Sequence, residues 1–355
     1  MKRKTNQPPS PAAVVVDVFC GAGGLSLGLQ QAGLEIAAGI DLDPACRHPF
    51  EHNIGAPFHR LDVTDVEATD VVAMFGDNPV RVLAGCAPCQ PFSGYTTKRR
   101  ESDDRWRLLM DFLRLVEQVR PEIVTLENVP RLALLPLWAK FVGALEAFGY
   151  QVVWKVVDAA DFGVAQNRRR VVLLASRIGA IGMPEPLSGP RRTVRDEVAT
   201  RPPVTAGACD SGDPLHRARG LTAINLERIR IAEPDGTWKR WPEHMRVRCH
   251  TEPTGRTYPS VYGRMAWDKP SPTITTQFYG FGNGRFGHPD QDRALTLREG
   301  AMLQSFPADF EFVPAGEPIV ARTIGRLIGN AVPPALGAAV GRTIAEHVRH
   351  CAPAI

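Results

Sequence analysis

Cys89 has the surroundings that most clearly suggest chemistry. Pro88 precedes it and Pro91 follows two residues later. Prolines restrict the backbone of their own and the preceding positions, which predicts a rigid extended turn. The strand-like run 80–84 lies just before this turn, so we expect the sulfur at the carboxyl end of a strand. A thiolate presented in this way is a candidate nucleophile.

The Cys86-x-x-Cys89 spacing also allows other interpretations. It resembles half of a zinc site, but no second pair at ligand spacing accompanies it, and no metal site is expected. It also resembles a redox pair, yet a redox pair gives the neighbouring Gln90 and Pro91 no role. For Cys86 we favour a buried structural cysteine.

Charged residues follow or precede two further strand-like runs. Glu127 comes directly after the run 123–126, at the edge where open α/β sheets place their ligands. Arg168 and Arg170 precede the run 171–175, and alternate residues of an extended segment point the same way. We therefore expect both guanidinium groups to reach one cleft, although a run of arginines is also typical of a solvated face.

A glycine-rich turn, residues 19–24, joins a strand-like run to a helix-like one. Gly21 and Gly23 let a ligand approach the backbone, and a helix N-terminus favours negative charge. The third glycine of a dinucleotide-binding pattern is missing, which favours a ligand with one nucleoside, such as S-adenosylmethionine. Asp41, at the end of the next strand, is expected to accept ribose hydroxyls. Asp62 is a candidate acceptor for an adenine amino group, or a loop cap.

The elements that must position these residues alternate between strand and helix. This alternation predicts an α/β fold with a mostly parallel sheet covered on both faces. The expected strands are 14–19, 36–40, 80–84, 123–126 and 171–175, and the expected helices are 25–32, 107–119 and 334–348. From about Gly179 proline and glycine become frequent and apolar runs shorten, which predicts an irregular, loop-rich second part.

Composition sets the general class of protein. The chain has 355 residues, a net charge of +4 and seven cysteines, an odd number without a repeating framework. We expect reduced thiols in the cytoplasm, no signal peptide and no membrane span. Between Arg191 and Arg264, lysine and arginine outnumber aspartate and glutamate by 14 to 9. Such an excess suits a polyanionic partner or a solvated surface.

Taken in order, these segments resemble the cytosine-5 DNA methyltransferase family of prokaryotic restriction-modification systems. The resemblance runs nearly end to end, and its motifs are 17–24 (DVFCGAGG), 88–90 (PCQ), 127–129 (ENV), 166–170 (QNRRR), 298–307 (REGAMLQSFP) and 329–334 (GNAVPP). It implies a Rossmann-like S-adenosylmethionine-dependent methyltransferase sheet with a smaller, loop-rich target-recognition domain. The implied catalytic and cofactor-binding domain is 1–185 plus 321–355, and the implied recognition domain is 186–320.

The resemblance also assigns the cofactor site. Phe19 would contact the adenine of S-adenosylmethionine, Asp41 its ribose and Asp62 its adenine amino group. Asn330 would lie near the methionine end, which returns the last helix to the first domain. Two positions depart from the family: Ala87 replaces a frequent proline, and Leu42 stands where some members stack a tryptophan on the adenine.

The implied chemistry begins with addition of the Cys89 thiolate to carbon 6 of cytosine. Glu127 would hydrogen-bond ring nitrogen 3, and Arg170, with Arg168, would hold the exocyclic oxygen. The base must first be flipped out of the duplex. Gln90 and Ser93 are assigned to substrate binding, and residues 93–104 to a lid over the base.

Sequence recognition would belong to the loop-rich part. The candidates for base or phosphate contacts are Arg240, Arg246, Arg248 and Arg256, of which the first three are our substrate-binding assignments. The expected partner is double-stranded DNA, with a cognate restriction endonuclease that forms no stable complex and with the enzyme itself a monomer. Three alternatives remain: a tRNA cytosine methyltransferase, a non-catalytic DNA-binding protein with this fold, and a nicotinamide oxidoreductase.

Overall fold

A computed structural model describes residues 13–88, 105–252 and 260–351 of the chain. Its strands are β1 (Val14–Val18), β2 (Glu35–Asp41), β3 (Phe58–Arg60), β4 (Arg81–Gly85), β5 (Ile123–Asn128), β6 (Gln151–Asp158) and β7 (Arg169–Ser176). They form one seven-stranded sheet in the order β3-β2-β1-β4-β5-β7-β6. The α/β fold predicted from the alternation of strands and helices is confirmed.

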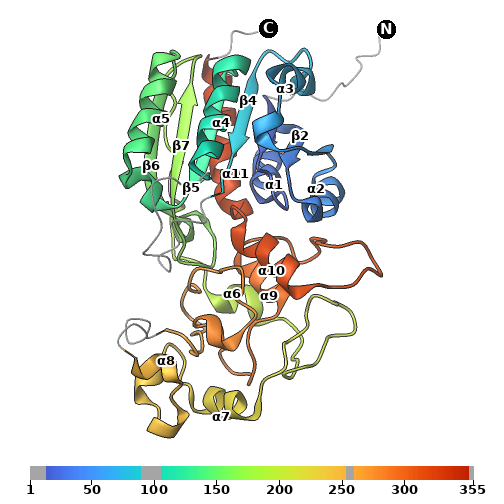
Figure 1. Cartoon of the computed structure of the whole chain (residues 1–355), viewed down its shortest axis with the longest axis vertical. Coiled ribbons are helices and arrows are strands. Elements are labelled where there is room, and N and C mark those ends of the chain that lie inside the picture. Colours follow the sequence, from blue (N-terminus) through green and yellow to red (C-terminus); the bar gives the residue numbers. More distant parts are fainter. Residues whose placement is uncertain (1–12, 89–104, 253–259, 352–355) are drawn as a thin grey trace.

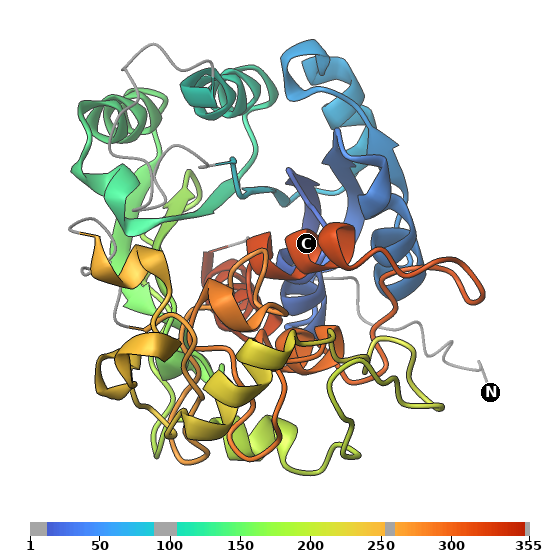
Figure 2. The same ribbon diagram turned by 60° about the horizontal axis from the view of Figure 1, so that its bottom comes forward.

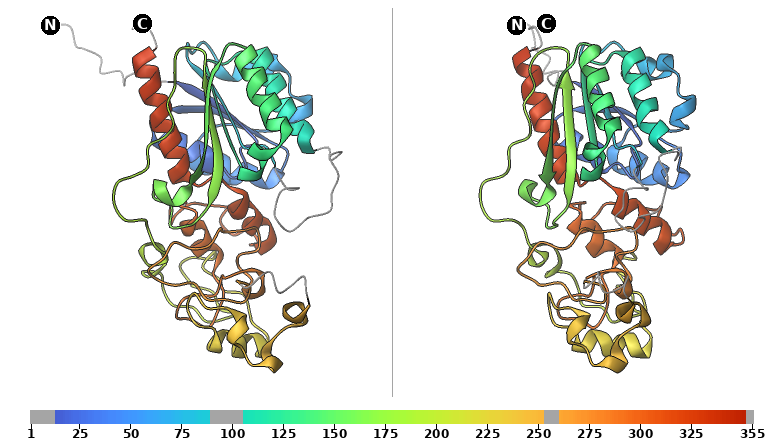
Figure 3. Two further views of the ribbon diagram at one scale, coloured as in Figure 1. Left: turned by 90° about the vertical axis from the view of Figure 1, so that its left-hand side faces the viewer. Right: turned by 60° about the vertical axis from the view of Figure 1, so that its left-hand side comes forward.

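Helices cover both faces of the sheet (Figure 1). The helices of the described residues are α1 (Gly24–Gln31), α2 (Arg47–Ile54), α3 (Ala68–Phe75), α4 (Arg105–Val119), α5 (Pro136–Ala147), α6 (Val194–Val198), α7 (Ala223–Ile231), α8 (Arg248–Thr251), α9 (Leu297–Leu303), α10 (Ala321–Asn330) and α11 (Pro334–Cys351). Of these, α6 to α10 lie below the sheet in Figure 1 and do not cover its faces. Figure 3 shows α11 on one side of the strands, with α4 and α5 on the other. In the described ranges no helix is both long and apolar enough to cross a membrane.

The alternation of side chains along β1 explains the two layers. Val15 joins the core that α1 and α11 contribute to, whereas Val14 and Val16 join the core of α3, α4 and α5. All five residues of β1 are buried. An apolar run with no polar face is what a strand covered on both sides requires.

β7 departs from the parallel arrangement. β1, β2, β3, β4 and β5 pair in parallel, whereas β7 runs antiparallel to both β5 and β6. The residues that begin β7 therefore lie at the edge where the parallel strands end. β6 and α5, together with α2 and α3, were not among the expected elements.

The chain after β7 has only short helices until α11, and Figure 2 brings this part forward. It contains a small core of its own, whose buried members are Ile229, Ala232, Trp238, Trp241, Met245, Phe281 and Ala294. Leu297 and Ala301 of α9 instead share the core of α1 and α11. The domain boundaries given above stay a prediction.

α11 packs very closely on α1. A Cβ atom on Gly28 of α1 would lie 2.2 Å from the carbonyl oxygen of Pro334. Such a contact is far shorter than any real Cβ contact, so only glycine fits there. The close approach of the two backbones fixes the last helix beside the glycine-rich turn.

Candidate active site

The polar residues of the site meet at one edge of the sheet because three strand ends are in register. Val18 pairs with Gly85, and Gly85 pairs with Leu126, so β1, β4 and β5 reach the edge at one level. Cys86 directly follows Gly85, the last residue of β4, and Glu127 directly follows Leu126 within β5. This edge is where an open α/β sheet places its ligands.

Each of the two carboxylate oxygens of Glu127 contacts one neighbouring side chain. Nε of Arg170 lies 2.9 Å from Oε1 of Glu127, and the Cys86 thiol donates to Oε2 at 3.0 Å. The Glu127 side chain is only 7% exposed and that of Arg170 14%. A carboxylate buried to this degree needs a charged partner, which Arg170 supplies. Cys86, expected to be a buried structural cysteine, is instead half-buried and bound to this carboxylate.

Arg168 has a different environment from the expected one. Its guanidinium is fully buried and donates to three backbone carbonyls, those of Ile274 at 3.1 Å, Gly329 at 3.0 Å and Ala331 at 3.1 Å. Burial, together with the nearby positive charge of Arg170, lowers the pKa of Arg168 to about 9. The expectation that both arginines face one cleft is corrected: Arg168 ties β7 to the chain segments before α9 and after α10.

The backbone just before Cys89 is held by the strand next to it. The Asn128 amide donates to the carbonyl oxygen of Ala87 at 3.0 Å, and both residues are buried. Cys89, Gln90 and Ser93, and the predicted lid 93–104, lie outside the described residues.

The glycine-rich turn takes up an unusual backbone conformation. Phe19, Gly21 and Gly23 have φ angles of 63°, 54° and 89°. A left-handed conformation is uncommon for phenylalanine and stores strain that the surrounding structure must hold. A Cβ on Gly21 would meet nothing within 4 Å, whereas one on Gly23 would lie 3.0 Å from Ile54 of α2. The turn is therefore open at Gly21 and supported by α2 at Gly23.

Asp41 fixes this turn from the end of β2. Its Oδ2 accepts from the backbone N–H of Gly21 at 2.9 Å, and its Oδ1 accepts from that of Asp43 at 2.9 Å. Burial raises the pKa of Asp41, while these two hydrogen bonds oppose the rise. A carboxylate held in this way keeps lone pairs to offer a ligand beside the turn.

Asp17 is a buried carboxylate in the middle of this region. Its Oδ2 accepts from the hydroxyl of Ser26 on α1 at 2.6 Å, and its buried Oδ1 has no hydrogen-bond partner among the described residues. Burial raises the pKa of Asp17 to about 7. This side chain connects β1 to α1 beneath the turn.

Two other predicted cofactor residues lie at element ends. The Asp62 carboxylate accepts from the backbone N–H of Thr64 at 3.1 Å, the loop-cap geometry that the sequence left open. Asn330 is the last residue of α10, and its side chain is exposed.

Of the predicted recognition arginines, Arg240 and Arg248 are exposed on the loop-rich part, and Arg246 is half-buried. Arg240 pairs with Glu233 at 2.7 Å, and Arg248 pairs with Glu252 at 2.9 Å. Arg246 differs, because its guanidinium donates to two backbone carbonyls, those of Trp241 and Lys239. The exposed Arg240–Glu233 and Arg248–Glu252 pairs contribute little to stability. Arg256 lies outside the described ranges.

Comparison with known proteins decides the family. The model of the C-5 cytosine-specific DNA methylase family matches residues 14–346. The chain is a member of this family. It is 44% identical over 335 residues to the Type II methylase M.HgiDII of Herpetosiphon aurantiacus, covering 93% of this chain and 94% of that protein. It is 32% identical over 338 residues to the Type II methyltransferase M1.HphI of Haemophilus parahaemolyticus, covering 93% and 86%.

Solved structures agree on the fold of this cytosine methylase. A putative DNA modification methyltransferase encoded within a prophage (E. coli) superposes with a TM-score of 0.75 at 21% identity, covering 95% of this chain and 99% of that one. The S. pombe Dnmt2 methyltransferase superposes with a TM-score of 0.66 at 17% identity, covering 95% and 99%.

Sequence reasoning missed three contacts of this methylase's site. These are the Asn128 bond to Ala87, the Cys86 bond to Glu127 and the Ser26 bond to Asp17. Asn128 and Cys86 belong to motifs that were noticed, but a hydrogen bond between two strands depends on register, which a single sequence does not show. Asp17 and Ser26 are nine residues apart on either side of a turn, so neither helix nor strand periodicity relates them in the sequence.

Proposed function

We propose that the chain transfers a methyl group from S-adenosylmethionine to carbon 5 of cytosine within a specific sequence of double-stranded DNA. The proposed route is a covalent adduct of Cys89 with a base flipped out of the duplex. The relatives named as Type II methylases favour a role beside a restriction endonuclease of the same specificity. We also propose that the enzyme is a cytoplasmic monomer and that it forms no stable complex with the endonuclease.

The observation that carries this proposal is the buried Arg170–Glu127 pair beside the segment that leads to Cys89. One end of the pair offers N–H donors and the other a carboxylate that can carry a proton. Cytosine presents the complementary set along one side of its ring, an exocyclic oxygen, ring nitrogen 3 and an amino group. The pair therefore matches the polar edge of a single flipped base.

The residues around the glycine-rich turn suit S-adenosylmethionine. Gly21 borders open space that a side chain would fill, and the Asp41 carboxylate is fixed beside it. Phe19 is held in the strained conformation that starts the turn. We propose that Phe19, Asp41 and Asp62 hold the nucleoside and that Asn330 lies near the methionine end. When bound, S-adenosylmethionine supplies an electrophilic methyl group on a sulfonium.

Cys89 supplies the nucleophile in the proposed reaction. Its thiolate forms a bond to carbon 6 of the ring, and the displaced electron pair makes carbon 5 nucleophilic. Carbon 5 would then take the methyl group, and the sulfonium sulfur would keep the electron pair of the broken methyl–sulfur bond and leave as a neutral thioether. A base removes the proton from carbon 5, the double bond between carbons 5 and 6 re-forms, and the bond from carbon 6 to sulfur breaks.

Glu127 and Arg170 stabilise charge on the ring during this sequence. Glu127, carrying a proton on Oε2, donates to ring nitrogen 3, and Oε2 is the oxygen that accepts from the Cys86 thiol at 3.0 Å. The Arg170 guanidinium donates a hydrogen bond to the exocyclic oxygen while its Nε keeps its contact with Oε1 of Glu127. Donors fixed before the reaction begins stabilise a transition state more than donors that must reorient. Arg168 has a positioning role in this scheme, because its own donors are bound to carbonyls.

The experiment that tests this function locates the modified base. Purified protein is incubated with labelled S-adenosylmethionine and either unmethylated genomic DNA or a tRNA pool, and modified positions are found by sequencing. Cys89→Ala is run in parallel, with Cys209→Ser as the matched control because Cys209 is exposed and far along the chain.

We expect 5-methylcytosine within one short DNA motif, lost in Cys89→Ala and kept in Cys209→Ser. Label found only in tRNA would overturn the DNA substrate. Label in neither nucleic acid, from folded protein that binds S-adenosylmethionine, would favour a non-catalytic DNA-binding protein.

A further inference from the structure

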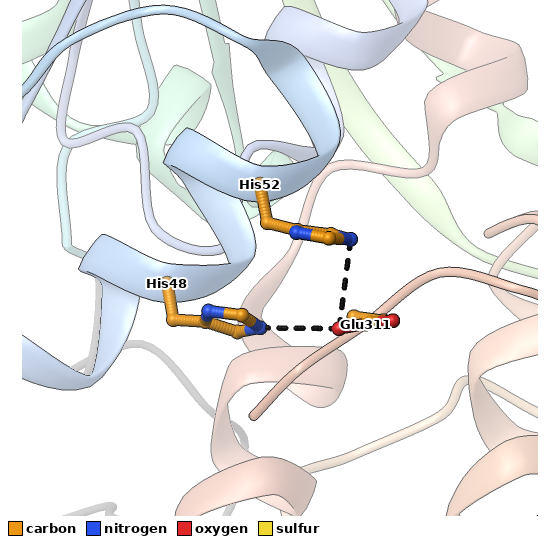
Figure 4. A group of neighbouring side chains, drawn as sticks. All are labelled: His48, His52 and Glu311. Carbon is orange, nitrogen blue, oxygen red and sulfur yellow. Dashed lines mark ion pairs between the residues drawn. The ribbon is translucent and has the colours of Figure 1, made fainter. Parts of the chain in front are cut away.

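Three side chains with metal-binding atoms meet on the far side of α2 from the glycine-rich turn. His48 and His52 lie one turn apart on α2, and Glu311 comes from the segment between α9 and α10 (Figure 4). Their ligand atoms all lie within 4.8 Å of one another. Both imidazoles point toward the carboxylate, and none of the three is used in the proposed methyl transfer.

We propose that His48, His52 and Glu311 bind one divalent transition-metal ion of the zinc class. The ion would join α2 to the segment that carries Glu311. Two histidines and a carboxylate are a set that zinc accepts, with a fourth position left for water. Imidazole ligands favour zinc, copper and nickel over calcium and magnesium.

The distances suit a metal better than a pair of hydrogen bonds. Nε2 of His48 lies 3.4 Å from Oε2 of Glu311, and Nε2 of His52 lies 3.5 Å from the same oxygen. A tetrahedral zinc ion with bonds of 2.0–2.1 Å separates its ligands by about 3.3–3.4 Å. Nε2 of His48 is also buried and has no hydrogen-bond partner in the described structure. A metal ion bound between these ligand atoms would give Nε2 of His48 a partner at the observed distances between the atoms.

The backbone around Glu311 is held in place without its carboxylate. The Asn53 side chain accepts from the N–H of Glu311 at 3.0 Å and donates to its carbonyl at 2.8 Å. Phe310 and Phe312, on either side, are buried and in contact with each other. Glu311 is therefore presented to the two histidines by a fixed segment, as a ligand must be for tight binding.

The position of the histidines on α2 explains how both reach one ion. Residues four apart on a helix lie on one face, and the two imidazole rings stack with centroids 5.1 Å apart. His48 is 27% exposed in its side chain and His52 51%, so an ion can enter from solvent. The three-residue site could not be predicted from the sequence, because Glu311 is distant in the chain from the two histidines.

Calorimetric titration of the full, untagged chain with Zn²⁺ tests the proposal, with Mg²⁺ and Ca²⁺ as comparison ions. His52→Gln and Glu311→Gln each remove one ligand, and both side chains are exposed enough for the fold to tolerate the change. His244→Gln, an exposed histidine in the loop-rich part, is the matched control for binding at any surface histidine. Visible absorption with Co²⁺ reports the coordination geometry.

We expect one Zn²⁺ per chain, a Kd at least tenfold weaker in His52→Gln and Glu311→Gln, and an unchanged Kd in His244→Gln. Hydrogen exchange in α2 should slow when Zn²⁺ is added to the unaltered chain. Equal Zn²⁺ binding by all three variants, or no saturable binding at all, would overturn the proposal and leave the cluster as a histidine–carboxylate ion pair. These readouts need no methyl transfer, so they are independent of the proposed function.

Discussion

Nε of Arg170 lies 2.9 Å from Oε1 of Glu127, and the two residues come from neighbouring strands that run in opposite directions. β5 reaches the ligand edge of the sheet with its last residues, and β7 reaches it with its first. The antiparallel strand is therefore what brings a cation to the carboxylate. With all strands parallel, the start of β7 would lie at the opposite edge.

Arg170→Lys should lower the turnover of methyl transfer by about 100-fold, the loss typical of one preorganised donor. A lysine cannot keep a contact to Glu127 while giving a second N–H to the base in the same plane. Steady-state kinetics with the cognate DNA measure the effect, and S-adenosylmethionine binding should stay within a few-fold. Arg169→Gln, an exposed neighbour, is the control. Equal turnover in Arg170→Lys and the unaltered chain would contradict the role given to the pair.

Arg168→Met should lower the free energy of unfolding by about 3 kcal/mol or more, because it leaves buried carbonyls without donors. Arg168→Lys should recover part of the loss. Urea denaturation measures both variants. If Arg168→Met unfolds like the unaltered chain and yet loses turnover, Arg168 contacts the base and its positioning role is wrong.

Asp17 should make stability depend on pH. Its folded pKa of about 7 lies above the ordinary value of 3.8, so the folded state binds the proton more tightly than the unfolded state. The stability from this proton is complete below about pH 4 and is lost as pH rises to about 7, at up to about 1.4 kcal/mol per pH unit. Asp17→Asn should flatten the unfolding free energy over this window, while exposed Asp77→Asn should not. Parallel curves for Asp17→Asn and the unaltered chain would show that Asp17 is not protonated in the fold.

DNA affinity should fall steeply with salt if the surface arginines contact phosphates. Arg240→Ala and Arg248→Ala should each reduce the slope of log affinity against log salt by about one. Fluorescence anisotropy at several salt concentrations measures the slopes. Arg230→Ala removes another exposed arginine, one paired with Asp292, and tests whether any surface arginine gives the same result. A flat dependence in the unaltered chain would argue against a phosphate-lined surface.

The fold was predictable where apolar runs were long and fully buried. β1, β4 and β5 have nearly continuous apolar character and were expected within one or two residues of their bounds. β6 was not expected, because Trp154 and Lys155 leave it exposed at the sheet's edge, where burial imposes no pattern.

The site was predictable as a set of motifs but not as a set of contacts. Glu127 and Arg170 were chosen from their places beside strands, and the structure brings them together. We expected Arg168 to reach the same cleft as Arg170, because alternation along a strand shows to which side of the sheet a side chain points. It does not show which backbone carbonyls lie there, since Ile274 and Gly329 come from distant segments.

The contact between Gly28 and Pro334 has a consequence for synthesis of the protein. α1 is translated before the loop-rich part, but α11, the helix that packs on it, is translated only after all of that part. Until α11 leaves the ribosome, the apolar side of α1 has no cover, and that side of the sheet stays incomplete. α11 therefore couples maturation of the glycine-rich turn to synthesis of a segment about 300 residues later in the chain, and a ribosome that stalls before Pro334 would leave a product exposed to proteases and chaperones.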